Sequence, residues 1–68
     1  MKLFPIDRAH NKGTYWVNPN LIVGVTKCNI GHKNQGVFGT SILVQGLIPL
    51  ETNESIESMI ERIENESN

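Results

Sequence analysis

The sequence predicts a small α+β protein: an antiparallel five-stranded meander sheet or partly open barrel, followed by one C-terminal amphipathic helix. Residues 1–50 contain short β-branched and aromatic segments separated by glycine, proline and asparagine, which is the pattern of strands and turns. Residues 51–68 carry an apolar stripe at helical spacing. Charge divides at the same place. Five Lys or Arg against one Asp give +4 in residues 1–50, and six Glu against one Arg give −5 in residues 51–68.

The whole chain, residues 1–68, is expected to form a single domain, because a chain of this length supports only one small core. Its predicted elements are strands at about 2–7, 14–17, 21–28, 37–44 and 47–50, and a helix at about 54–65.

Turn residues set the boundaries of the first three strands. Gly13 closes the turn His10–Gly13, since glycine adopts left-handed backbone without a steric cost. The next turn, Asn18–Asn20, has proline in its first central position. Pro5 cannot donate a hydrogen bond to a strand ladder, which predicts an edge position for the first strand.

The second half of the sheet surrounds a polar loop. Asn29–Gly36 separates the third strand from the fourth, and Gln45-Gly46 is predicted to be a two-residue hairpin turn. Pro49 predicts that the last strand also lies at an edge.

The helix has the clearest local signal. Thr52 or Asn53 can cap its start, and glutamates occupy the first turn, where the helix dipole favours carboxylates. One face carries the apolar residues Ile56, Met59, Ile60 and Ile63, which we expect to cover the sheet.

Composition excludes several classes of protein. Cys28 is the only cysteine, so no disulfide forms within the chain, and a reducing, cytoplasmic location is expected. No apolar run is long enough to span a bilayer, and the first residues do not form a signal peptide. A pI near 6.0 without a basic cluster argues against non-specific nucleic-acid binding.

The apolar pattern of two predicted strands indicates a homo-oligomer. Leu21-Ile22-Val23 and Ile42-Leu43-Val44 lack the alternation of a strand with one solvated face. A single helix covers only one face of the sheet, so a second copy of the chain is expected to cover the other. The alternative is a tightly curled barrel that fills its own interior.

In a meander, alternate connections lie at the same end, so the first turn and the polar loop should share one end. Cationic and amide side chains there predict a site for a small anionic ligand, phosphate-like or nucleotide-like, while Glu51 and Glu54 partly oppose it. The candidate ligand-binding residues are Arg8, His10, Lys12, Lys27, His32, Lys33 and Asn34. The alternative is ordinary solvated loops with scattered charge.

No catalytic arrangement, metal site or cofactor is predicted. Cys28 and His32 are four residues apart, with His10 as a third ligand at most, and zinc requires three or four ligands in a closed geometry. Cys28 is expected to be a buried apolar residue rather than a nucleophile. Ser41 has no nucleophile-elbow context, so we expect the protein not to be an enzyme.

From Val17 to Glu64 the layout resembles small FlbD-like flagellar and swarming-motility proteins and similar short phage or prophage proteins. The resemblance rests on Val17–Ile22, Thr40–Val44, Gly46 and Glu51–Ile60. It implies a small sheet with a C-terminal helix that acts by binding, without catalysis. The longer Asn29–Gly36 loop and Pro49 depart from the pattern.

Two functions are therefore expected from the sequence. The first is a homo-oligomeric binding protein that captures an anionic ligand, as a phage protein sequestering a nucleotide signal would. The alternative is a regulator that docks on a larger host or motility protein through its helix or an exposed sheet edge.

Overall fold

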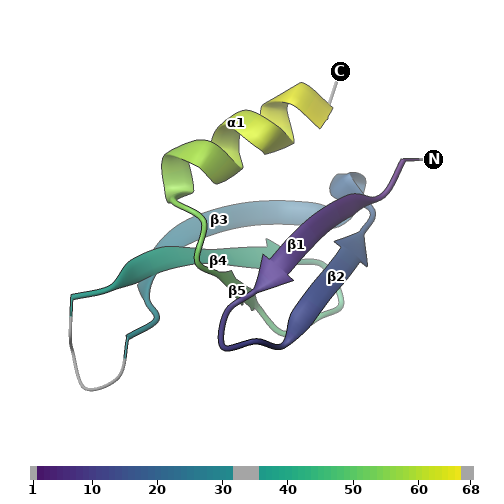
Figure 1. Cartoon of the computed structure of the whole chain (residues 1–68). Helices are drawn as coiled ribbons and strands as arrows, with labels where there is room; N and C mark the ends of the chain where they lie inside the picture. The colour runs from purple at the N-terminus through teal and green to yellow at the C-terminus, as the bar shows by residue number, and fades with distance from the viewer. Residues whose placement is uncertain (1, 32–35, 67–68) are drawn as a thin grey trace.

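The computed structural model describes residues 2–31 and 36–66. It contains five strands, one short 3₁₀ helix and one α-helix (Figure 1). In chain order they are β1 (Phe4–Arg8), β2 (Gly13–Val17), η1 (Pro19–Leu21), β3 (Ile22–Asn29), β4 (Phe38–Val44), β5 (Leu50–Thr52) and α1 (Ile56–Glu66).

The five strands form one antiparallel sheet in the order β2-β1-β5-β4-β3. Strands that follow one another in the chain are paired, except β2 and β3, and β1 pairs with β5. This is the pairing of an up-and-down barrel that is open between β2 and β3. The predicted fold class, a small antiparallel sheet that is not closed with one C-terminal helix, is confirmed.

The core lies between the curled sheet and α1. The sheet contributes Ile6 and Ile42, and α1 contributes Met59, and all three are completely buried. The whole cluster consists of Phe4, Ile6, Val17, Ile42, Val44, Leu50 and Met59. α1 packs chiefly against β3 and β4 (Figure 1), where Met59 is buried and Ile63 partly buried, whereas Ile60 of the predicted stripe is 40% exposed.

The connection from β5 to α1 is fixed by hydroxyl groups. Thr40, which is fully buried, donates a hydrogen bond of 2.8 Å from Oγ1 to the carbonyl oxygen of Glu54. Ser55 caps the helix by accepting a hydrogen bond from the backbone N–H of Ser58 at 3.2 Å. Thr52, one of the two predicted caps, instead accepts from the N–H of Glu54, one turn before the helix.

Arg62 ties the helix to β1. Its Nη2 donates to the carbonyl oxygen of Pro5 at 2.7 Å, and its Nη1 contacts Glu54 Oε1 at 2.5 Å. The guanidinium lies 4.5 Å from the centre of the Phe4 ring. The single basic residue of the acidic segment is therefore a structural link between two elements that are far apart in sequence.

Both predicted edge strands lie inside the sheet. β1 is between β2 and β5, and β5 is between β1 and β4. Pro5 is tolerated because β5 reaches only as far as Arg8 on that side. Pro49 is tolerated because β5 begins one residue later, at Leu50, so the strand predicted at 47–50 is shifted toward the C-terminus.

The outer face of the sheet remains exposed in the single chain. Leu43 is 38% exposed, whereas Ile42 and Val44 on either side of it are buried. No helix of the described residues is long and apolar enough to cross a membrane.

Candidate functional site

The turn between β1 and β2 has an unusual backbone. His10 and Asn11 have φ angles of 63° and 58°, in the left-handed region. Two successive residues with positive φ characterise the hairpin turn of type I′, which matches the twist of the paired strands. Each non-glycine residue in this conformation costs roughly 1–2 kcal/mol, although histidine and asparagine are enriched there.

Arg8 is held against this turn. Its Nη2 donates to the carbonyl oxygen of Lys12, and its Nε donates to that of Gly13 at 3.4 Å. The guanidinium also lies 5.7 Å from the centre of the Tyr15 ring. The turn therefore positions the arginine side chain.

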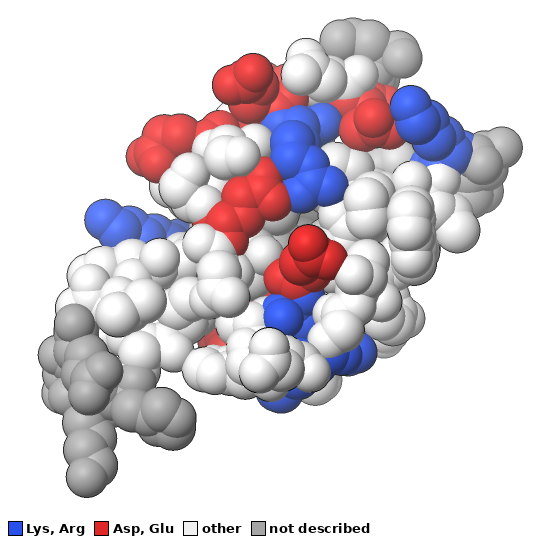
Figure 2. All heavy atoms as spheres, viewed as in Figure 1, with Lys and Arg blue, Asp and Glu red and all other residues white. Residues whose placement is uncertain are grey.

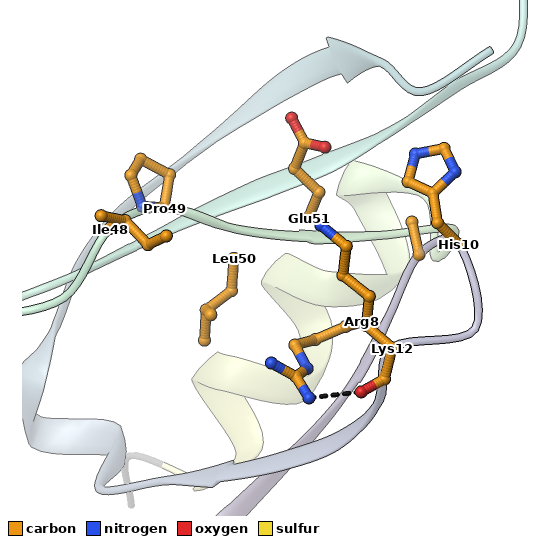
Figure 3. A pocket seen from close by; sticks show the side chains of 8 residues that line it. Arg8, His10, Lys12, Ile48, Pro49, Leu50 and Glu51 are labelled. Atoms are coloured by element: carbon orange, nitrogen blue, oxygen red, sulfur yellow. Dashed lines mark hydrogen bonds between the residues drawn. The ribbon is translucent and has the colours of Figure 1, made fainter. Parts of the chain in front are cut away.

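A pocket of about 100 Å³ lies between this turn and the segment that leads into β5 (Figure 3). The backbone N–H of Ala9 donates to the carbonyl oxygen of Glu51 at 2.7 Å, which holds the two sides together. The lining residues are Arg8, Ala9, His10 and Lys12 from the turn, and Ile48, Pro49, Leu50 and Glu51 from the other side.

The size of the pocket limits what it can hold. Pockets for drug-sized ligands measure about 300–1,000 Å³. The hollow therefore suits a single small group, such as one phosphoryl or carboxylate, rather than a whole nucleotide.

The pocket has a positive balance of charge. Arg8 and Lys12 each contribute one positive charge, and Glu51 contributes one negative charge. Figure 3 shows the Glu51 carboxylate and the Arg8 guanidinium extending in opposite directions. The arginine end of the pocket is therefore the more favourable place for an anion.

The structure brings together only part of the predicted site. Arg8, His10 and Lys12 surround the pocket, but Lys27 lies elsewhere, with its ammonium 4.8 Å from the centre of the Phe38 ring. Lys27 borders a separate hollow with the start of α1. The remaining candidates, His32, Lys33 and Asn34, lie outside the described residues.

The apolar side of the pocket was not predicted from the sequence. Ile48, Pro49 and Leu50 reach it because β1 pairs with β5, a contact between residues about forty positions apart. Glu51, which the sequence predicts only as an opposing charge near this end, lines the pocket as well. Glu54, the other opposing residue, contacts Arg62 instead.

Cys28 is a partly exposed thiol in β3. Burial raises the pKa of Cys28 above its ordinary value, and the negative charge of Glu51 raises it further. A hydrogen bond with the backbone of Gly39 lowers this pKa but does not cancel the increase. A raised pKa reduces the thiolate fraction and hence nucleophilicity.

Within residues 2–31 and 36–66, no three His, Cys, Asp or Glu side chains lie together so as to hold a metal ion.

Comparison of the chain with protein-family models, curated proteins and solved structures gives no match. The resemblance to FlbD-like and short phage proteins therefore stays a prediction.

Proposed function

We propose that this protein is a non-catalytic binding protein that captures a phosphate-like anionic group in the pocket beside the β1–β2 turn. The observation that carries the proposal is that Arg8, His10 and Lys12 all line one small hollow. Arg8 is already positioned by two turn carbonyls, so less of its conformational freedom remains to be lost when an anion binds.

Strain in the turn supports the same proposal. His10 stands at a position where glycine would be more stable, since its φ is 63°. Residues in sparsely populated backbone conformations cluster at binding and catalytic sites, where the surrounding structure holds them in place. His10 is also one of the residues that line the pocket.

The pocket dimensions suggest how a larger ligand would bind. A phosphoryl group fills the hollow, and the rest of a nucleotide extends over Ile48, which is 81% exposed. Sequestering a nucleotide signal, as a phage protein would, is one role that such a site supports.

The lone Cys28 favours a reducing compartment, so the cytoplasm is the expected place of action.

A thermal-shift series tests the anion site. The panel contains inorganic phosphate, pyrophosphate, and nucleoside mono- and triphosphates. A ligand at 100 times its Kd stabilises the folded state by about 2.7 kcal/mol. For a domain of this size, each kcal/mol raises Tm by about 4–8 °C, so a true ligand should raise Tm by roughly 10–20 °C.

Three variants assign that shift to the pocket. Lys12→Ala should abolish it, whereas Lys2→Ala, which removes one positive charge from the exposed ion pair with Glu66, should preserve it. Glu51→Gln should strengthen binding several-fold, because it removes the only negative charge lining the pocket. Equal losses in the Lys12 and Lys2 variants would mean that only net charge matters, and the pocket would lose its role.

His10→Gly separates strain from binding. Glycine relieves the left-handed backbone, so the anion-free protein should gain about 1 kcal/mol in stability while the anion-induced shift decreases. A variant that is both more stable and equally responsive to anions would remove His10 from the site.

Self-association is part of the proposal. The exposed side chain of Leu43, between the buried Ile42 and Val44, leaves the face of the sheet away from the core without an apolar cover. Small domains commonly supplement a limited core by oligomerising.

One observation favours docking on a larger protein as a second candidate function. An apolar hollow of about 200 Å³ lies between β3 and α1, lined by Ile60, Ile63 and the start of β3, with Glu64 beside it. Glu57 and Glu61 are exposed on the same helix, so the matching partner would be a basic segment with apolar anchors. Ile60→Lys should abolish co-purification of such a partner and leave the anion response intact.

A further inference from the structure

The open barrel has two edge strands, β2 and β3, and only one of them has features that prevent pairing with another chain. β3 carries an irregularity in register between Ile22 and Gly24, and it presents Lys27 farther along. Bulges and lysines are devices that keep exposed edges from pairing with other chains. β2, with the sequence Gly-Thr-Tyr-Trp-Val, has neither a charge, nor a proline, nor a bulge in its pairing with β1.

The register shows which backbone groups of β2 point outward. In β1 and just after it, the backbone N–H of Ala9 donates a hydrogen bond to β5, and the carbonyl oxygen of Pro5 accepts one from Arg62. Because backbone groups alternate in direction along a strand, Pro5 and Asp7 face away from β2. Their partners across the ladder are Trp16 and Thr14, which therefore present their own N–H and C=O groups at the free edge.

We propose that β2 pairs with β2 of a second copy of this chain, antiparallel, about a two-fold axis that passes beside Tyr15. In this register Thr14 lies opposite Trp16 of the second copy, and Trp16 lies opposite its Thr14. Both pairs are hydrogen-bonded, so four outward N–H groups and four outward C=O groups become satisfied. The self-complementarity follows from the positions of Thr14 and Trp16, one residue on either side of Tyr15.

Charge favours this edge over other surfaces for contact with an identical chain. From Gly13 to Thr26 the sequence has no charged residue, so two copies meet there without repulsion. The region 51–68 has six Glu against one Arg, and Figure 2 shows most of the acidic side chains in view gathered over α1. Two copies that approached through the helix would repel one another.

The side chains next to the edge extend the apolar contact. Trp16 is 58% exposed, and with Leu21 and Leu47 it borders a hollow of about 280 Å³ that no charged residue lines. A fully buried aromatic side chain contributes about 150–250 Å². Three side chains that are each about half exposed, plus one strand edge, give an interface at the small, transient end of the range, below about 1,200 Å² in total. The expected dimer is accordingly weak and transient.

This inference goes beyond the proposed function, because pairing along the β2 edge leaves the face that carries Leu43 uncovered, and it is independent of the anion site. Sedimentation equilibrium of the full chain, from low micromolar to millimolar concentration, measures it directly. Emission from Trp16, the only tryptophan, should shift to shorter wavelength over the same range as its ring leaves water. Anion binding with no dimer would contradict this inference alone, and a dimer with no anion binding would contradict the anion site alone.

Two substitutions at one residue identify the edge. Thr14→Pro removes the outward N–H, whereas Thr14→Val keeps it, and both lose the hydrogen bond of 2.5 Å from Thr14 Oγ1 to Asp7. The valine variant should dimerise like the wild type, and the proline variant at least tenfold more weakly. Equal dimerisation by the two variants, or a wild type that stays monomeric at millimolar concentration, would overturn the proposal.

Trp16→Lys provides a second test should the proline variant fail to fold. A lysine at an edge discourages pairing and leaves the intramolecular ladder to β1 intact. This variant should be a folded monomer. Assemblies larger than a dimer that persist in the Trp16→Lys variant would contradict the assignment of self-association to the β2 edge.

Discussion

Replacing Arg62 by alanine is expected to destabilise the protein more than any other exposed-charge substitution. The side chain makes three contacts: a hydrogen bond of 2.7 Å to the carbonyl of Pro5, an ion pair of 2.5 Å with Glu54, and a face contact with Phe4. Arg62 therefore joins α1 to β1 through both a hydrogen bond and a ring contact.

The magnitude follows from these contacts taken separately. A hydrogen bond to a charged group contributes about 1.5–3 kcal/mol. The ion pair is partly exposed, with 35% and 23% of the two side chains accessible, and contributes at most about 1 kcal/mol after screening. A cation over an aromatic face contributes about 0.5–1 kcal/mol. Because the contacts share one side chain they are not additive, and we expect a total loss of about 2–3 kcal/mol.

Urea denaturation of the Arg62→Ala variant at neutral pH measures this loss, and Tm should fall by roughly 10–20 °C at about 4–8 °C per kcal/mol. Arg62→Lys should recover only part of the stability, because an ammonium cannot make the planar contacts together. Lys2→Ala, in an exposed ion pair with Glu66 at 3.5 Å, is the matched control and should cost less than about 1 kcal/mol. A loss in Arg62→Ala no larger than that of the control would refute the reasoning.

Three further predictions concern the sheet. Gly39→Ala should lower the free energy of unfolding by about 3 kcal/mol or more, because a Cβ there would overlap the carbonyl oxygen of Thr52. Gly24→Ala is the control: its Cβ would meet Leu43 at an ordinary 3.6 Å, so this variant should fold normally by circular dichroism. Thr40→Val should lose about 1–2 kcal/mol in urea denaturation, since it deletes a buried hydrogen bond of 2.8 Å, and an unchanged midpoint would contradict that role. The thiol of Cys28 should react with a maleimide more slowly than a free thiol at pH 8, because its pKa is raised, and faster reaction would contradict the assigned environment.

The elements of the fold were predictable because their signals are local. Turn residues marked the first two connections, and the spacing from Ile56 to Ile63 identified the helix. The sheet order was not predictable from the two prolines. Pro5 and Pro49 indicate where ladder hydrogen bonds are missing, but a short neighbouring strand can leave them unpaired inside a sheet just as an edge does.

The candidate site could be predicted only on the side that the β1–β2 turn supplies. Arg8, His10 and Lys12 lie within five residues, so the hairpin alone brings them together. Ile48 and Glu51 join them through the pairing of the first strand with the last, which no local pattern encodes. Lys27 was misplaced because the assumption that all loops at one end converge ignores the width and curl of the sheet.

The most direct test of the anion site is a two-dimensional ¹⁵N–¹H NMR titration of the whole chain with pyrophosphate. The proposal predicts saturable amide shifts confined to the β1–β2 turn, residues 8–13, and to the facing segment, residues 48–51. These shifts should vanish in Lys12→Ala and persist in Lys2→Ala. Shifts that centre on the start of α1 and Lys27, or that increase linearly without saturation, would contradict the proposed site.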